Sequence, residues 1–416
     1  MTKMIEPPKR KNPLSRTRQP MLPPRARSRR AHELTRAAAE GRFALQRCGD
    51  CGTFVYPARE ACPACLSADL VLTDAPDGAT ILSLTTAEVP SDNYFRERAP
   101  WRLALVKLDC GPTAIAHLHR DAGPEGPVKM SLKLDKAGQA VFFAGPLEAR
   151  PDMADDPQWR EMTADPKFRR VLITDGRNPV CGPLVDALKK SGAGEIFVGI
   201  AEDWKPFAGR AALAAIPGVT LVTLDLSSDQ SVFELAADYG AKVDILINTA
   251  DFVRPGGLLQ PGALNPARGA MDVLVFGSMR LAQAFAPVMA SRGADGVTSA
   301  CAWVNLLSIY GQAANPSYAA YGAAHAAALA LSHALRAELA TGGVRLMNVF
   351  SGPTDSEWFQ ALPQPKVAPK AIADAVVDGL KRGLEDLYVG DIARDLHERL
   401  LENPKAVERA LAGPSS

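Results

Sequence analysis

The sequence lacks the features that define several large classes of protein. No apolar run approaches the roughly 20 residues that cross a bilayer, and no secretory signal is visible. The net charge is only +1 over 416 residues, so charge alone favours no nucleic acid, membrane or acidic partner. We therefore expect a cytoplasmic protein without a membrane segment. Its length and its 47% apolar content predict more than one domain, each with its own core.

Four of the seven cysteines stand in two closely spaced pairs. Cys48 and Cys51 are followed by Cys62 and Cys65, with Gly or Pro near each turn. Two such pairs can place four thiolates around one tetrahedral ion, and zinc favours a closed shell of soft sulfur ligands. Two disulfides or four separate thiols are the alternatives, and the absence of a secretory signal weighs against disulfides. The spacing predicts a structural zinc site.

The residues before and after the cysteines differ sharply in character. Residues 1–30 are rich in Pro, Lys and Arg, which predicts a mobile basic tail, with a docking arm for an acidic partner as the alternative. Residues 31–42 suggest a short helix that leads into the first cysteine pair. From 69 to 147, short alternating runs separated by Gly, Pro and Asp predict a small antiparallel barrel. His117 and His119 share one face of a predicted strand, where we expect ordinary strand surface.

The first part of the chain resembles a known family. The stretch Gly-Arg-Phe-x-Leu-Gln-Arg-Cys-x-x-Cys-Gly, then Pro-x-Arg before Cys-Pro-x-Cys, then a small barrel are similar to the acyl-CoA-associated zinc-ribbon/OB-fold proteins. The resemblance covers residues 31–147, with the zinc ribbon at 31–68 and the barrel at 69–147. It implies an accessory subunit that binds a thiolase-like, aldolase-like or hydratase-like enzyme, and contact with acyl-CoA.

One loop of the expected barrel combines aromatic and basic residues: Tyr94, Phe95, Arg96, Arg98, Trp101 and Arg102. Such a loop suits the phosphates and the adenine of coenzyme A. Some OB barrels also bind nucleic acid through exposed aromatics in a basic groove. We favour acyl-CoA over nucleic acid here.

Residues 148–168 are polar, with Pro and acids, and predict a linker. Strands and helices then alternate, which predicts a doubly wound parallel sheet with nucleotide-binding geometry. Residues 169–360 resemble a short-chain dehydrogenase/reductase, because a set of landmarks follows in that family's order: Asp225, Asn248, Ser308, Tyr321 thirteen residues later, and the stretch from Asn348. The resemblance implies a Rossmann-like oxidoreductase domain that uses NAD(P). Ser308 and Tyr321 would be catalytic, with His325 in the usual Lys position, and Asp225 and Asn248 would contact the cofactor.

The cofactor loop departs from this family. Where the family has Thr-Gly-x-x-x-Gly-x-Gly, the chain reads TDGRNPVC from Thr174. The ungapped register loses all three glycines, and a shift by one residue keeps Gly176 but places Val180 at the middle glycine. We prefer the ungapped register. In either register, Asp175 lies where phosphates should bind and is expected to cap the following helix. Arg177 can reach a phosphate. Asp175, Gly176 and Arg177 are the candidate loop contacts.

The catalytic positions also depart from the family. His325 replaces the Lys that lowers the tyrosine pKa, and Leu274 replaces the usual Asn. A neutral histidine affects Tyr321 only weakly. Because these changes gather at cofactor-facing positions while the apolar framework persists, we expect a degenerate domain that serves as a scaffold. The alternative is an active NAD(P)-dependent oxidoreductase acting on a keto- or hydroxyacyl thioester or a related ketone.

The last part of the chain concerns assembly. Small residues fill the helix predicted at 318–340, which in this family contributes to a homodimer interface, so we expect a homodimer. Residues 361–416 predict a C-terminal extension of three helices at about 368–383, 391–402 and 404–412.

Overall fold

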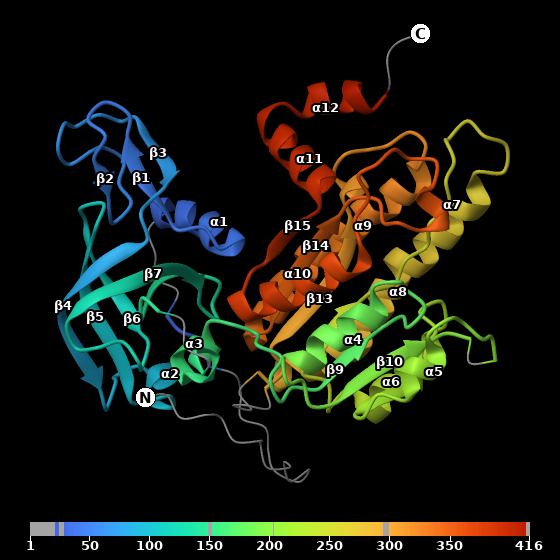
Figure 1. Cartoon of the computed structure of the whole chain (residues 1–416), viewed down its shortest axis with the longest axis horizontal. Helices are drawn as coiled ribbons and strands as arrows, with labels where there is room; N and C mark the ends of the chain where they lie inside the picture. The colour runs from blue at the N-terminus through green and yellow to red at the C-terminus, as the bar shows by residue number, and fades with distance from the viewer. Residues whose placement is uncertain (1–20, 25–28, 149–151, 203, 294–298, 413–416) are drawn as a thin grey trace. The chain divides into compact units, whose positions relative to one another are not determined.

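The computed structural model describes residues 21–24, 29–148, 152–202, 204–293 and 299–412, which form two compact units (Figure 1). The first unit contains residues 21–165 with 381–385, and the second contains the described residues of 166–380 and 386–416. Most of the expected basic tail lies outside the described residues. The predicted fold class is confirmed: a zinc ribbon and a small barrel occur in one unit, and a parallel α/β sheet in the other.

A three-stranded sheet carries the cysteine pairs. The strands are ordered β2-β1-β3, and β1 runs antiparallel to both neighbours. The elements are α1 (Glu33–Glu40), β1 (Ala44–Cys48), β2 (Phe54–Val55) and β3 (Leu70–Asp74). Helix α1 buries Leu34, Ala37 and Ala38 and ends at Gly41, whose φ of 72° is a left-handed conformation that favours glycine. One face of α1 therefore joins the core that the barrel shares.

The barrel closes in the strand order β4-β5-β6-β8-β7. All neighbouring strands are antiparallel except β6 and β8. Its strands are β4 (Gly78–Ala87), β5 (Trp101–Leu108), β6 (Thr113–Leu118), β7 (Gly126–Leu134) and β8 (Ala140–Gly145). Alternate residues of β5, namely Ala104, Val106 and Leu108, point into the core, as the period of two predicts.

Residues 152–165 of the segment predicted as a linker are instead a packed part of the first unit. They form a 3-10 turn (Met153–Asp155) and α3 (Pro157–Glu161), beside the short α2 (Asn93–Arg96) of the barrel. Trp159 packs in one cluster with Trp101 and Phe143. The Gln158 amide bonds both backbone groups of Arg102, at 2.8 and 3.0 Å. Aromatic packing and these bonds hold α3 on the barrel.

The second unit is built on a seven-stranded parallel sheet ordered β11-β10-β9-β12-β13-β14-β15. Its strands are β9 (Val171–Ile173), β10 (Ile196–Ile200), β11 (Val219–Thr223), β12 (Ile245–Asn248), β13 (Ala302–Ser308), β14 (Arg345–Ser351) and β15 (Asp386–Val389). Strand β15 was not expected, because four residues, Asp-Leu-Tyr-Val, give little periodic signal. The region predicted as a helical extension thus supplies the seventh strand.

Helices cover both faces of this sheet (Figure 1). Side chains of α6, α8 and α9 pack in one core with Leu172, Leu246, Trp303 and Leu346, and α4 and α10 lie on the other face. The helices are α4 (Cys181–Lys190), α5 (Arg210–Ala214), α6 (Asp229–Tyr239), α7 (Leu264–Ala270), a π-helical turn (Met271–Phe276), α8 (Gly277–Ser291), α9 (Ala319–Leu339), α10 (Pro369–Arg382), α11 (Asp391–Glu402) and α12 (Pro404–Leu411).

One helical stretch of the described residues, 264–291, is long and apolar enough to cross a membrane. A core helix of a globular domain meets the same criteria, so one such stretch is weak evidence. Leu281, Phe285 and Met289 from this stretch are fully buried in the sheet's core. Packing inside the second unit thus buries part of this stretch, 33% of its most apolar window.

Candidate functional site

The two cysteine pairs adopt matching turns. In the first, the Cys48 N–H donates to the Thr53 carbonyl and the Cys48 carbonyl accepts from Gly52. Cys62 makes the same two bonds, at the same spacing, with Ser67 and Leu66. Gly52 and Leu66 occupy equivalent positions, both with positive φ. The repeated turn brings all four Sγ atoms within 4.8 Å of one another. Zinc–sulfur bonds of about 2.3 Å in a tetrahedron need a sulfur spacing of about 3.8 Å, so the residues fit a structural zinc ion.

The aromatic and basic loop of the barrel is turned inward. Tyr94 and Trp101 are each only 2% exposed. Arg98 lies over the Tyr94 ring at 4.0 Å and pairs with Glu161 at 3.0 Å. The Arg102 guanidinium donates to backbone carbonyls, including that of His119 at 3.0 Å. These contacts already occupy the groups that were expected to bind coenzyme A or nucleic acid.

His117 of β6 and His119, just after it, also have partners inside the protein. His117 Nδ1 accepts from the Trp101 indole at 2.9 Å. His119 is fully buried, and its ring nitrogens contact the Met153 carbonyl at 3.0 Å and the Asp121 N–H at 3.0 Å. His119 is therefore a structural residue. The sequence analysis expected ordinary strand surface at this position.

In the second unit, a cavity of about 450 Å³ lies where the strand order reverses between β9 and β12. Ligands bind at this point in doubly wound sheets, outside the carboxyl ends of the strands. Two threonines join the carboxyl ends of β9 and β12. Thr249 N–H donates to Thr174 Oγ1 and Asp175 N–H donates to Thr249 Oγ1, both at 3.0 Å. The cavity wall at this point is thus fixed by reciprocal hydrogen bonds.

The loop from β9 to α4 satisfies its own backbone donors. Arg177 N–H donates to Asp175 Oδ1 at 2.8 Å, and Val180 N–H donates to Asn178 Oδ1 at 2.9 Å. The N–H groups of Gly176 and Cys181 bond the carbonyls of Gly199 and Asn178 at 2.8 Å. Asp175 thus bonds within the loop. The sequence analysis expected Asp175 to cap α4, but α4 has no side-chain cap.

Arg177 does not face the position of a phosphate. Its guanidinium donates to the Glu202 carboxylate at 2.6 Å and to the Glu202 carbonyl at 3.0 Å. This partner lowers the pKa of Glu202. Burial raises the pKa of Asp175, and the nearby charge of Asp251 adds to the rise. The loop therefore offers a carboxylate, and few free donors, at the place where the family binds pyrophosphate.

Ser308, Tyr321 and His325 meet in the same cavity, as the resemblance implied. The Tyr321 and His325 rings pack edge to face, with centroids 4.4 Å apart. Burial, then the charge of Asp251, raises the pKa of Tyr321 well above its usual value. Tyr321 is held as a neutral phenol and not poised to ionise.

Some predicted contacts lie elsewhere. The Asp225 carboxylate accepts from Ser227 N–H and Oγ, at 2.9 and 2.7 Å, and does not line this cavity. Gly176 fills a tight position, since a Cβ there would lie 2.6 Å from Ile200 Cδ1. Asn248 points to the opposite face of the sheet, where it donates to Ser278 Oγ at 3.3 Å.

Other cavity residues were not predicted from the sequence: Asn178, Thr249, Asp251, Arg254 and Trp358. One signal for Asp251 was available, because the stretch Asn248-Thr-Ala-Asp251 stands where the short-chain dehydrogenase/reductase family has an Asn-Ala-Gly turn. Arg254 stacks on Phe252 at 4.6 Å and on Trp358 at 4.1 Å. These aromatic contacts hold the only arginine besides Arg177 among the described residues lining this cavity.

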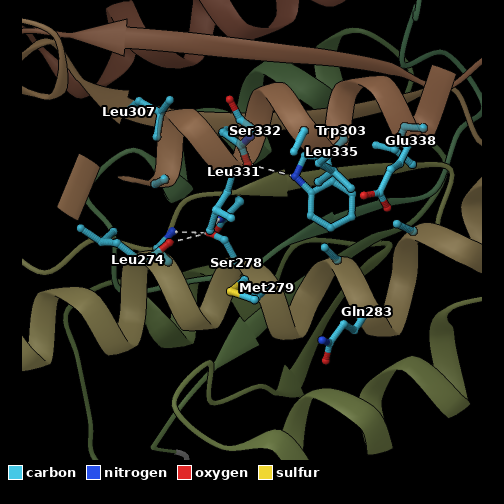
Figure 2. Close-up of a pocket in the computed structure, with 18 of the residues that line it drawn as sticks. Leu274, Ser278, Met279, Gln283, Trp303, Leu307, Leu331, Ser332, Leu335 and Glu338 are labelled. Atoms are coloured by element: carbon cyan, nitrogen blue, oxygen red, sulfur yellow. Dashed lines mark hydrogen bonds between the residues drawn. The ribbon is translucent and has the colours of Figure 1, made fainter. Parts of the chain in front are cut away.

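A second cavity, of about 800 Å³, lies between α8 and α9 (Figure 2). Met279 and Gln283 project from α8, and Leu331, Leu335 and Glu338 project from α9. Trp303 lies on the strand beneath them, with its indole bonded to Asn305 Oδ1 at 2.9 Å. Leu274, at the position of the family's Asn, lines this cavity and not the first one. The cavity is a mainly apolar groove with a polar floor.

Three family descriptions match the chain in sequence order. "ChsH2, rubredoxin-like zinc ribbon domain" matches residues 35–71, and "ChsH2, C-terminal OB-fold domain" matches residues 72–135. "Enoyl-(Acyl carrier protein) reductase" matches residues 183–384. The last match begins after the loop from β9 and extends through α10.

Curated relatives match about half of the chain. Dehydrogenase/reductase SDR family member 7B of Danio rerio is 28% identical over 204 residues, which are 47% of this chain and 60% of the relative. The 1-deoxy-11-beta-hydroxypentalenate dehydrogenase of Streptomyces exfoliatus is 28% identical over 206 residues, 48% of this chain and 72% of the relative. The chain thus spans less than two thirds of the first relative.

Solved structures agree with this assignment. A short-chain dehydrogenase from Burkholderia cenocepacia, in complex with NADP, has a TM-score of 0.53 at 29% identity and covers 59% of this chain and 98% of its own. A second, from Streptomyces avermitilis, has a TM-score of 0.50 at 23% identity, covers 57% and 94%, and supports the fold alone. The chain therefore joins a zinc ribbon and an OB-fold barrel of the ChsH2 type to a domain that is like the short-chain dehydrogenases/reductases.

Proposed function

We propose that this protein is an accessory subunit in cytosolic acyl-CoA metabolism whose dehydrogenase-like domain has lost ordinary NAD(P) binding. In this proposal the zinc-ribbon and OB-fold half binds a thiolase-like, aldolase-like or hydratase-like enzyme. The dehydrogenase-like half acts as a scaffold that forms a homodimer. The ChsH2-type domains support the first part, and the altered cofactor loop supports the second.

The main support is the loop that joins β9 to α4. In a dinucleotide-binding loop, free backbone N–H groups and a helix N-terminus attract the pyrophosphate. Here four of those groups bond within the protein, Pro179 has no N–H, and Asp175 adds a carboxylate. The one arginine of the loop is paired with Glu202. A pyrophosphate bound there would have to displace these bonds and face an acidic group.

The catalytic positions support the same conclusion. The family needs a cation near the tyrosine to bring its pKa toward neutrality. His325 stands in place of that cation, and the nearby Asp251 instead carries the opposite charge. Tyr321 therefore remains protonated, which removes it as a base for oxidising an alcohol.

The groove between α8 and α9 supports the homodimer. It is lined by small side chains, such as Ala282, Ala286 and Ala334, that permit close approach of other helices. Phe276 and Met279, 52% and 40% exposed, stand beside it. A second copy of the same two helices would cover this apolar surface, and we propose this arrangement for the dimer.

The alternative is an active NAD(P)-dependent oxidoreductase that acts on a keto- or hydroxyacyl thioester or a related ketone. Two observations favour it: Ser308 and Tyr321 remain together in one cavity, and the Burkholderia relative holds NADP. In this case Tyr321 would act as an acid in the direction of reduction, for which a protonated phenol is the required form.

Titration of the full chain with NADH and NADPH, followed by nucleotide fluorescence, separates the two functions. The accessory function predicts no binding in the millimolar range, and micromolar binding contradicts it. For the partner, the full chain is co-purified with a thiolase-like, aldolase-like or hydratase-like enzyme encoded beside it. A complex of fixed stoichiometry supports the proposal, whereas separate elution of the two proteins contradicts it.

A further inference from the structure

His325 is fixed in one neutral form by its surroundings. The side chain is only 2% exposed. Its Nδ1 accepts a hydrogen bond from the backbone N–H of Ser308 at 3.2 Å. An imidazolium carries a proton on both nitrogens and could not accept this bond. The imidazole is therefore neutral, with its proton on Nε2, and it acts as a hydrogen-bond donor on the side of the cavity.

That donor has no partner within the described residues. Nε2 is buried and makes no hydrogen bond. The nearest carboxylate oxygen, Asp251 Oδ1, lies 3.7 Å away, which is beyond a direct hydrogen bond. A buried unpaired donor is costly to a folded protein, and it indicates that another group completes the site. The missing group must lie within reach of Nε2.

Asp251 supplies the second half of the site. Its Oδ1 accepts from the Phe252 N–H at 2.8 Å, and its side chain is 34% exposed. One oxygen atom placed within hydrogen-bonding distance of both His325 Nε2 and the Asp251 carboxylate would join them. To join them it must accept one hydrogen bond and donate another. A hydroxyl group does both, whereas a carbonyl oxygen accepts only and would be repelled by the carboxylate.

The charges that face the cavity select an uncharged ligand. Asp175, Asp251 and Glu357 line it, and its two arginines already have partners: Arg177 pairs with Glu202, and Arg254 stacks on aromatic rings. A phosphate or carboxylate would meet these three carboxylates, and Arg254 is the one arginine of the described lining without a paired carboxylate that could offset them. A volume of about 450 Å³ is within the range of sites for small molecules.

We propose that this cavity binds the hydroxyl group of an uncharged ligand, held between His325 Nε2–H as donor and the Asp251 carboxylate as acceptor. The ligand class rests on the proposed place in acyl-CoA metabolism, which indicates an acyl thioester entering by its uncharged end, and the donor and acceptor of the cavity add the hydroxyl group. The contact requires no nicotinamide and assigns no oxidation step. It gives Asp251 and His325, both departures from the family, a shared binding role.

A matched pair of uncharged probes tests this contact: S-(3-hydroxybutyryl)-N-acetylcysteamine and S-butyryl-N-acetylcysteamine, which differ only in the hydroxyl group. Binding of each to the full chain is measured by isothermal titration calorimetry. We expect the hydroxylated probe to bind about tenfold more tightly, the effect of about one net hydrogen bond. Equal affinities, or no binding of either probe in the millimolar range, would overturn the proposal.

Two substitutions locate the selectivity. His325→Asn keeps an acceptor for the Ser308 N–H but removes the donor at Nε2, so the tenfold preference should disappear. Asp251→Asn should weaken the preference, because the charged acceptor is lost. His333→Asn, on the exposed face of the same helix, is the control and should leave the tenfold preference for the hydroxylated probe intact. Persistence of the preference in His325→Asn would overturn the proposal. Unchanged circular dichroism verifies that each variant folds.

The NADPH titration keeps this result separate from the proposed function. No NADPH binding together with equal probe affinities overturns the hydroxyl contact and leaves the accessory function standing. Micromolar NADPH binding with a retained probe preference that depends on His325 supports the hydroxyl contact and contradicts the accessory function.

Discussion

The Asp175 carboxylate accepts a hydrogen bond from the backbone N–H of Arg177 at 2.8 Å, so an acidic side chain occupies a donor that would otherwise face a phosphate. Replacing Asp175 with Gly removes the carboxylate and frees this donor. We expect NADPH affinity to rise by about tenfold, since removing a like charge from a poorly solvated site contributes on the order of 1.4 kcal/mol. Fluorescence titration of the variant and the native chain measures the change.

Asp186→Asn provides the control for that titration. Asp186 lies on α4 but is exposed, so its loss changes the net charge by the same amount away from the cavity. A similar gain in both variants would show that only the overall charge matters. No gain in Asp175→Gly would show that Asp175 does not oppose the cofactor.

Asp175 also predicts a dependence of stability on pH. Burial raises its pKa in the folded state, so the folded chain binds the proton more tightly than the unfolded chain. The contribution of Asp175 to the stability of the folded chain is fully present below the unfolded pKa of about 3.9 and is lost as pH rises through the folded pKa. Asp175→Asn keeps the acceptor for Arg177 without a charge. We expect a higher Tm than native at pH 7 and a difference that shrinks toward pH 4, measured by calorimetry.

Glu161 predicts the opposite dependence in the first unit. Burial would raise its pKa, but the charges of Lys136 and Arg98 and the bond from the Tyr94 hydroxyl lower it to about 2. The stabilising contribution is thus present above the unfolded pKa of about 4.3 and is lost as pH falls toward 2. Glu161→Gln leaves two cations without their carboxylate, and we expect a loss of about 3 kcal/mol at pH 7.

Denaturant unfolding of native chain and Glu161→Gln at pH 7 and at pH 3 measures this difference. The loss should be smaller at pH 3, which lies below the unfolded pKa of about 4.3, because the unfolded carboxylate binds a proton there while the native one stays mostly ionised. An equal loss at both pH values would assign the effect to packing and not to charge.

The sequence predicted the metal site and the fold class because both depend on local patterns. Cys48, Cys51, Cys62 and Cys65 show their spacing directly, and strand and helix periods follow from burial. The inward turn of Trp101 could not be predicted, because it depends on packing against residues about 40 to 60 positions away.

The candidate cavity shows the same division. Ser308, Tyr321 and His325 were identified through the resemblance to the short-chain dehydrogenases/reductases, whose catalytic positions they match. Asp251 was seen as a departure but not assigned to the site, because only folding places the end of β12 beside α9. Arg177 was expected to reach a phosphate, but its ion pair with Glu202 joins two loops whose proximity no local pattern shows.

The groove between α8 and α9 predicts how the homodimer can be disrupted. Ala334 is exposed at the groove, so Ala334→Glu would place a charge in an apolar interface. We expect a shift from dimer to monomer, measured by light scattering coupled to size-exclusion chromatography. Ala337→Glu, exposed on the same helix but outside the groove, should remain dimeric. A dimer in both variants would place the interface elsewhere, and a monomeric native chain would contradict the dimer itself.

Metal removal tests the matching cysteine turns. Metal analysis should give about one zinc per chain, and replacing Cys48 and Cys51 with Ser should abolish it. Cys48 and Cys62 share their small core only with Val55 and the partly buried Leu70. So few apolar contacts hold the two cysteine turns only weakly, and binding of the ion must supply much of the free energy that orders them.

We therefore expect chelation to lower the Tm of the first unit, with the second unit unaffected. Cys110→Ser, outside the cluster, is the control and should keep both zinc and Tm. An unchanged Tm after complete zinc removal would mean that the hydrogen bonds of the two turns suffice. The cysteine spacing would then have predicted the geometry but not the force that maintains it.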